Sequence, residues 1–174
     1  EEHLGILKLE LKSSSLPNIL NNMPKLLALK TACELLYSLI PEKDSIPTLY
    51  ESTVAFFSSL ALDNFFNYYI KWEISLLKHL GYGLDFSKCA VCNKNHELTY
   101  VSPKTGAAVC AQAGEAYKSK LLVIPKFFNH NTDNITLAEK KEALALTGYF
   151  IERIYAGYNK AITNSRKMLL KVIS

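Results

Sequence analysis

The sequence of 174 residues has no hydrophobic run of the roughly 18 residues that a membrane-spanning helix needs. It also has no secretory signal, because it opens on Glu1, Glu2 and His3 without a methionine. We therefore expect no membrane partner, a cytoplasmic location and a natural N-terminus upstream of Glu1. With four cysteines and no export signal, a Cys-x-x-Cys pair is expected to bind metal or act in redox chemistry rather than form a structural disulfide.

Motifs of the common catalytic sites are missing as well. There is no glycine-rich phosphate loop, no Gly-x-Ser-x-Gly elbow, no His-Glu-x-x-His pair and no deaminase His-x-Glu with Pro-Cys-x-x-Cys. None of His3, His79, His96 and His130 has a neighbouring serine or cysteine in an arrangement that suggests a nucleophile. The sequence therefore predicts a protein that is not an enzyme.

The chain has little excess charge, since 20 Lys and Arg against 16 Asp and Glu give a formal net charge of +4. This excess permits a nucleic-acid or acidic-peptide partner but falls short of a protein that coats DNA by charge alone. Between residues 102 and 127 the only acidic residue is Glu115, and the basic residues are Lys104, Lys118, Lys120 and Lys126. These lysines could contact DNA phosphates or form an ordinary solvated face.

What the sequence does contain is helical periodicity on a background that is 49% hydrophobic. Helices are expected near residues 24–39, 48–62, 65–80, 136–155 and 164–172. Capping boxes at Thr48-x-x-Glu51 and Thr136-x-x-Glu139 would open two of them, and Gly81 and Gly157 would end two. Cys33 lies on the apolar stripe of the first helix and is predicted to be a small core residue.

Seven aromatic residues between Phe56 and Trp72 recur at helical spacing. Such a cluster could stack on bases, but its helical period favours core packing of two helices. Elsewhere, residues 3–12 alternate apolar and charged side chains as a half-buried strand does, and residues 98–110 form two short strands around a Pro/Gly turn. The predicted fold is mainly α: a helical, bundle-like body with a small zinc-ribbon-like β-hairpin insertion and one leftover N-terminal strand.

Three cysteines surround the predicted hairpin. Cys89 and Cys92 form one Cys-x-x-Cys knuckle, and Cys110 follows at about the 15–20-residue spacing of a zinc ribbon. A structural zinc site needs four ligands, and the fourth should stand at position 113, which is alanine. Zinc with His96 or water as fourth ligand is one alternative, and metal-free thiols are the favoured one. A thioredoxin-like redox pair is disfavoured, because no suitable strand–helix pattern surrounds Cys89.

Several motifs around the cysteines occur in a recognisable order. They are Trp72-Glu73, Leu76-Leu77, Leu80-Gly81-Tyr82-Gly83-Leu84-Asp85, Cys89-Ala90-Val91-Cys92, Tyr100-Val101-Ser102-Pro103-Lys104-Thr105-Gly106 and Ser165-Arg166-x-x-Leu169-Leu170. Together they resemble the RecO family of DNA repair and recombination-mediator proteins. The resemblance covers most of the chain from about Leu26 onward.

The resemblance implies an N-terminal oligonucleotide-binding barrel followed by a helical domain. Residues 1–15 would then be the last strand of the barrel, and residues 16–174 the helical domain, with the hairpin insertion at about 85–127. It implies binding of single- and double-stranded DNA, strand annealing and, with RecR, loading of RecA onto DNA coated by the single-stranded-DNA-binding protein. It also implies a nucleoid-associated location in the bacterial cytoplasm.

For the candidate sites, zinc-binding members carry cysteine at the place of Ala113, so the resemblance implies a decayed metal site and no cofactor. It also places the acidic C-terminal tail of the single-stranded-DNA-binding protein near Ile70, Lys71 and Trp72, where an apolar slot would lie beside a cation. The rival hypothesis is a structural zinc-ribbon module that binds proteins and has no direct DNA role.

Overall fold

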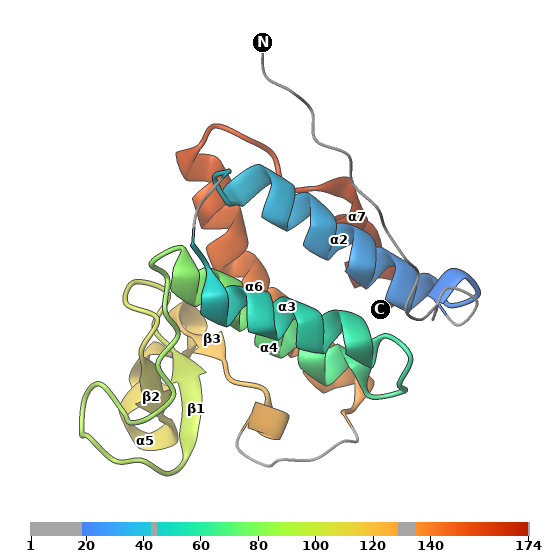
Figure 1. Ribbon diagram of the computed structural model, residues 1–174. Coiled ribbons are helices and arrows are strands. Elements are labelled where there is room, and N and C mark those ends of the chain that lie inside the picture. The colour runs from blue at the N-terminus through green and yellow to red at the C-terminus, as the bar shows by residue number, and fades with distance from the viewer. Residues whose placement is uncertain (1–18, 43–44, 129–134, 174) are drawn as a thin grey trace.

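The computed structural model describes residues 19–42, 45–128 and 135–173 (Figure 1). The predicted strand over residues 3–12 lies outside these ranges, as does the boundary expected at residue 15. The helical body consists of α2 (Met23–Leu39), α3 (Pro47–Ser59), α4 (Phe65–His79), α6 (Leu137–Gly157) and α7 (Asn164–Val172). The prediction of a mainly α fold with a small β insertion is confirmed.

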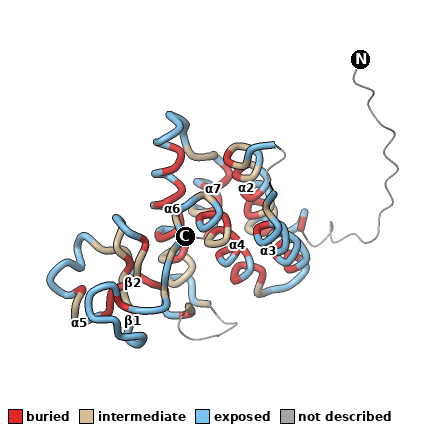
Figure 2. The backbone as a smooth tube through the Cα atoms, turned by 60° about the vertical axis from the view of Figure 1, so that its left-hand side comes forward, coloured by how far each residue is buried: buried red, intermediate tan, exposed pale blue. Residues whose placement is uncertain are grey.

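The helices pack around one shared core. α3 lies along α4, α2 lies along α7, and α4 contacts α6. Figure 2 shows that buried residues occupy the sides on which these helices face one another, and that exposed residues cover their outer sides. The strands lie apart from α2 and α7, at the end of the body where α4 ends (Figure 1). The packed helices therefore form the body from which the β-hairpin insertion projects.

An aromatic cluster fills the space between α3 and α4. Phe56, Tyr69 and Trp72 are all fully buried, and the Phe56 and Tyr69 ring centroids lie 5.3 Å apart in an edge-on arrangement. The Trp72 indole N–H donates a hydrogen bond of 2.9 Å to Thr53 Oγ1, which satisfies its polar atom. The prediction of core packing is confirmed for these rings.

Phe65 and Phe66 are buried too, whereas Phe57 and Tyr68 are 37% and 36% exposed. For these last two residues the core prediction is wrong. Both lie on the outer side of their helices. Phe57 directly follows the buried Phe56, and Tyr68 directly precedes the buried Tyr69.

Cys33 is exposed, so its assignment to the core is also wrong. The buried face of α2 is rotated by about one residue from the predicted stripe, and it carries Leu27, Ala28, Ala32, Leu35 and Leu39. Ala28 and Ala32 are 0% exposed. Small buried alanines allow close packing against the rest of the body, and a stripe chosen by side-chain size overlooks them.

The helix ends match the sequence signals unevenly. The capping box of α6 is present, with the Glu139 N–H donating to Thr136 Oγ1 and the Thr136 N–H donating to the Glu139 carboxylate. α3 instead begins at Pro47, after Ile46 and without a side-chain cap, because proline already has the φ angle of a first helical turn. Gly157 is still helical, and Asn159 with its φ of 53° ends α6 in its place.

A buried ion pair joins α4, α6 and α7. Arg166 Nε lies 3.0 Å from Glu73 Oε1 and Arg166 Nη2 lies 3.1 Å from Glu73 Oε2, and neither side chain is more than 1% exposed. The Tyr69 hydroxyl donates to the same carboxylate at 2.6 Å, and Arg166 Nη2 also donates to the Leu144 carbonyl at 3.0 Å. Burial and the Glu73 charge raise the pKa of Tyr69 well above its usual value, so it stays a donor.

Candidate functional site

The predicted hairpin is present. β1 (Leu98–Val101) pairs antiparallel with β2 (Ala108–Cys110), and the turn between them covers residues 102–107. A third strand, β3 (Leu122–Val123), pairs with the other edge of β1 and was missed because two residues show no alternation. The connection from β2 to β3 contains α5 (Ala111–Gly114) and the 3₁₀ helix η1 (Glu115–Lys120), and η2 (Lys126–Phe128) follows.

The insertion is attached to the body by the residues after α4. Gly81 has a φ of 83° and ends α4, with the Tyr82 N–H bonded to the Leu77 carbonyl at 2.8 Å. The chain then runs back beside the hairpin, where Asp85 forms a β-bridge with Ala107.

A second attachment comes from α6. Arg153 Nη1 donates a hydrogen bond of 3.1 Å to the Pro103 carbonyl in the hairpin turn, and its guanidinium lies 6.0 Å from the Tyr82 ring centroid. The hairpin is thus held from two helices.

Gly106 is the tightest point of this attachment. Its φ is 73°, and a Cβ added there would lie 2.9 Å from the Gly83 carbonyl oxygen. We expect Gly106→Ala to lower the free energy of unfolding by about 1–3 kcal/mol, measured by urea denaturation. Gly157→Ala is the matched control, because its Cβ would meet nothing within 4 Å and it lies in a helix. Equal stability of the two variants would contradict this account of the turn.

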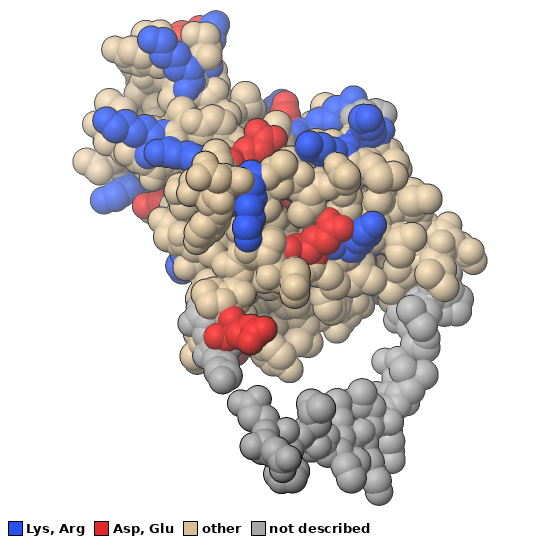
Figure 3. Space-filling view, turned by 90° about the horizontal axis from the view of Figure 1, so that it is seen from above, with Lys and Arg blue, Asp and Glu red and all other residues tan. Residues whose placement is uncertain are grey.

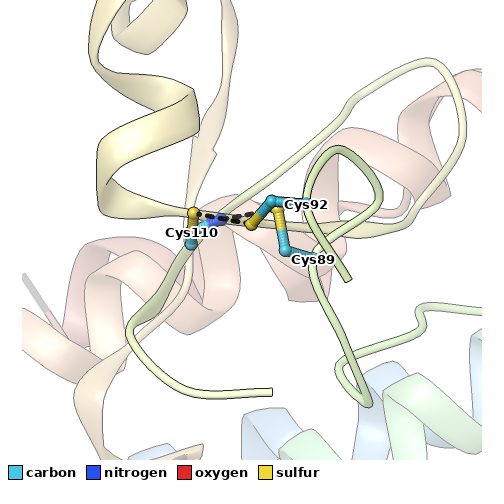
Figure 4. A group of neighbouring side chains, drawn as sticks. All are labelled: Cys89, Cys92 and Cys110. Atoms are coloured by element: carbon cyan, nitrogen blue, oxygen red, sulfur yellow. Dashed lines mark hydrogen bonds between the residues drawn. The ribbon is translucent and has the colours of Figure 1, made fainter. Parts of the chain in front are cut away.

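The three cysteine side chains converge between the knuckle and β2 (Figure 4). The Sγ atoms of Cys89, Cys92 and Cys110 all lie within 4.8 Å of one another. Cys92 and Cys110 are the pair in hydrogen-bond contact, with 3.6 Å between their sulfurs. Cys89 and Cys110 are buried, whereas Cys92 is exposed. The structure therefore brings together the three cysteines that the sequence offered as possible metal ligands.

Backbone N–H groups surround the sulfur of Cys89. The Cys110 N–H and the Val91 N–H lie 3.3 and 3.4 Å from Cys89 Sγ. Burial raises the pKa of this thiol, but the N–H groups of Cys110, Cys92 and Val91 outweigh burial and lower the pKa of Cys89 to about 6. These hydrogen bonds fix the position of the Cys89 sulfur within the cluster.

A fourth ligand is missing from the described part of the chain. The only group of His, Cys, Asp and Glu side chains there that is close enough for a metal consists of the three cysteines. The His96 side chain is 64% exposed, and its Nδ1 lies 3.9 Å from the Glu97 carboxylate. Ala113, on α5, has no donor atom. The donor set therefore supplies three of the four ligands of a structural zinc site and does not complete it.

The four lysines of the predicted strip are all exposed. Lys104 lies in the hairpin turn, Lys118 and Lys120 on η1, and Lys126 at the start of η2. Lys118 Nζ lies 2.6 Å from Glu115 Oε1, so its charge is locally compensated and its pKa is raised by that carboxylate. On the face seen in Figure 3, Lys and Arg side chains cover more of the surface than Asp and Glu do. They lie in several separate groups rather than in one patch.

The residues predicted for tail binding do not share a surface. Ile70 and Trp72 are both 0% exposed and belong to the core, so neither can contact a peptide. Lys71 is exposed on the opposite side of α4. Periodicity alone could have separated them, because consecutive residues of a helix point in different directions. A role for Lys71 remains a prediction.

Two other features were missed. A cavity of about 250 Å³ lies at the start of α3, lined by Ser45, Ile46, Pro47, Thr48, Leu49, Ser75, Lys78 and His79. The buried pair of Glu73 and Arg166 was also missed, although Glu73 directly follows Trp72 on the apolar side of α4. A carboxylate in that position is a sequence signal for a buried partner.

Body and insertion together define the class of this protein: a helical domain that carries a small antiparallel sheet with three clustered cysteines. The family model described as "Recombination protein O C terminal" matches residues 20–161. The chain is 38% identical to DNA repair protein RecO of Rickettsia canadensis over 172 residues, which is 99% of the chain and 71% of that relative. It is 40% identical to DNA repair protein RecO of Rhodospirillum centenum over 154 residues, 87% of the chain and 61% of that relative.

The chain belongs to the RecO family of DNA repair proteins, as the sequence motifs predicted. The expectation that it is not an enzyme agrees with this family, whose members are named for recombination and repair. No solved structure matches the chain. Among the described residues, no helix has the length and hydrophobicity to cross a membrane.

Proposed function

We propose that this chain is the helical part of a recombination mediator that binds single- and double-stranded DNA and promotes annealing of complementary strands. With RecR, it would help to load RecA onto DNA coated by the single-stranded-DNA-binding protein. The observation that carries this proposal is membership of the RecO family along nearly the whole chain.

The β-hairpin insertion is the part of the chain that we propose contacts DNA. Lys104 and Lys120 are exposed and form no ion pair with another described residue, so their charge is available to phosphates. Lys126 is exposed as well, and it interacts electrostatically with the Glu139 carboxylate. Tyr117 is 62% exposed on η1, between residues of the same strip, and offers a ring on which an unpaired base can stack. Phosphate contacts and stacking together suit single strands, which annealing requires.

Strand annealing tests this proposal directly. Two complementary oligonucleotides, one carrying a fluorophore and the other a quencher, are mixed with and without the chain. Faster loss of fluorescence in the presence of the chain is expected. An unchanged rate, at concentrations where the chain is folded, would speak for the rival function.

The rival is a zinc-ribbon module that binds proteins without contacting DNA. The convergence of three sulfurs supports it, because such a cluster resembles part of a zinc knuckle. If zinc were bound, Cys89, Cys92 and Cys110 would hold it, and it would supply a structural cross-link. We propose that the site carries no zinc, because Ala113 offers no fourth ligand. Metal analysis of the purified chain decides the matter, and one equivalent of zinc would contradict us.

We also propose that an acidic tail of the single-stranded-DNA-binding protein docks along the exposed side of α4. Lys71, Ser75 and Lys78 follow one another at helical spacing and lead to the cavity of about 250 Å³ at the start of α3. Ile46 and Leu49 give this cavity apolar walls, and Lys78 gives it positive charge. An acidic peptide that ends in an aromatic residue needs both features.

Charge reversal in this cavity should weaken peptide binding. We expect Lys78→Glu to lower the affinity for a synthetic acidic peptide with a C-terminal phenylalanine by about tenfold, because an attractive charge beside the peptide becomes a repulsive one. Isothermal titration calorimetry measures the affinity. Lys141→Glu is the control, because Lys141 is exposed on α6 and does not line the cavity. If the two variants had equal affinities, the peptide would not bind in the cavity at the start of α3.

A further inference from the structure

The three thiols of the insertion form a site that the proposed DNA function does not use. We propose that Cys92 and Cys110 form a reversible disulfide, which closes the ribbon where a complete zinc site would otherwise close it. Their sulfurs are already 3.6 Å apart, on the knuckle and on β2 respectively. A disulfide needs about 2.05 Å, which small rotations of the two side chains can supply.

Exposure determines which thiol reacts first. Cys92 is exposed and can meet a small oxidant in solution, whereas Cys89 and Cys110 are buried. A hydroperoxide supplies the oxidising equivalent. The Cys92 sulfur attacks the peroxide, the O–O bond breaks, and Cys92 becomes a sulfenic acid with release of water or an alcohol.

The second step is intramolecular. The Cys110 sulfur attacks the Cys92 sulfur, the S–O bond breaks, and a second water leaves as the disulfide forms. In total, two thiols lose two protons and two electrons to one peroxide. A dithiol such as dithiothreitol returns both electrons and regenerates the thiols.

The environment of Cys89 explains why we propose a disulfide between Cys92 and Cys110 and not one that contains Cys89. Its sulfur accepts N–H groups from Cys110 and Val91 and is 0% exposed, so it is fixed and shielded from the oxidant. Cys92 is in hydrogen-bond contact with Cys110, which lies on the strand that leads back to the hairpin turn. The cross-link would therefore join the knuckle to β2 and leave Cys89 as a thiol.

We propose a transient rather than a permanent bond, because a pair that includes the exposed Cys92 can be reached by both an oxidant and a reducing dithiol. Oxidation would then cross-link the ribbon during peroxide stress, the condition under which DNA repair is in demand. This inference stands apart from the proposed DNA function, because it rests only on the thiols.

Thiol counting by mass tests the proposal. The chain carries Cys33→Ser, which leaves three thiols, and is treated with hydrogen peroxide and then alkylated with a maleimide under denaturing conditions. We expect three adducts before oxidation, one after it, and three again after dithiothreitol. Peptide mapping should find Cys92 joined to Cys110. Cys89→Ser should still form this disulfide, whereas Cys92→Ser should lower the rate of thiol loss at least tenfold.

Three results would overturn the proposal: three adducts that persist after peroxide, a disulfide that contains Cys89, or one equivalent of zinc in the purified chain. The circular dichroism of each variant shows that it is folded. DNA binding is measured separately, so loss of the disulfide and loss of the proposed function remain distinguishable.

Discussion

Replacing Arg166 with methionine is expected to lower the free energy of unfolding by about 3–5 kcal/mol. Methionine has a similar volume but no charge, so the Glu73 carboxylate would be left 0% exposed without its cation. Urea denaturation followed by circular dichroism measures the change. Lys167→Met is the matched control, because Lys167 is exposed on the same helix and should alter stability by no more than about 0.5 kcal/mol.

The double variant Glu73→Leu with Arg166→Met separates the cost of an unpaired charge from the worth of the pair. With both charges removed, stability should recover a large part of the loss, because apolar pairs often replace buried ion pairs at little cost. Recovery stays incomplete, since the Tyr69 hydroxyl loses its acceptor. If Arg166→Met were as stable as Lys167→Met, the pair would not hold α4, α6 and α7 together.

Reversing three charges on the insertion should weaken binding to a single-stranded oligonucleotide by about a hundredfold at about 0.1 M salt. The variant is Lys104→Glu, Lys120→Glu and Lys126→Glu; Lys118 is left unchanged because Glu115 already pairs with it. In a plot of log affinity against log salt, each phosphate contact contributes about −0.7 to the slope. The loss of three contacts should therefore reduce the size of the slope by about 2. Fluorescence anisotropy measures both quantities.

The matched control has the same change in net charge on the helical body. Lys141→Glu, Lys160→Glu and Lys167→Glu reverse three exposed lysines of α6, its C-terminal loop and α7. This variant should keep its affinity within about threefold, because only long-range attraction changes. If both triple variants lost affinity equally, DNA affinity would depend on the net charge of the chain and not on the lysines of the insertion.

Helix positions could be predicted because periodicity and end signals are local. The predicted span of α7, residues 164–172, is the observed one, and the Thr136 capping box opens α6 as expected. Cys33 and Phe57 were misplaced because which neighbouring helix covers a face depends on tertiary packing. The two-residue strand β3 was missed since it exists only through pairing with β1.

The same distinction between local sequence signals and tertiary packing applies to the candidate site. The spacing of Cys89, Cys92 and Cys110 offered them as possible ligands of one site, because it reflects how a ribbon brings two knuckles together, and their sulfurs do lie within 4.8 Å of one another. Spacing could not show that the Cys92 and Cys110 sulfurs lie 3.6 Å apart. Nor could it show that Ile70 and Trp72 are buried while the cavity beside Lys78 offers apolar walls. Those facts depend on long-range contacts.

The salt dependence of DNA binding by the unmodified chain tests the central claim most directly. A labelled single-stranded oligonucleotide is titrated with the chain between about 50 and about 200 mM KCl. Three phosphate contacts predict a slope of about −2 in the plot of log affinity against log salt, and therefore about a 20-fold weakening across this range. Binding that is undetectable at the lowest salt, or that does not change with salt, would contradict a DNA-binding role for this domain.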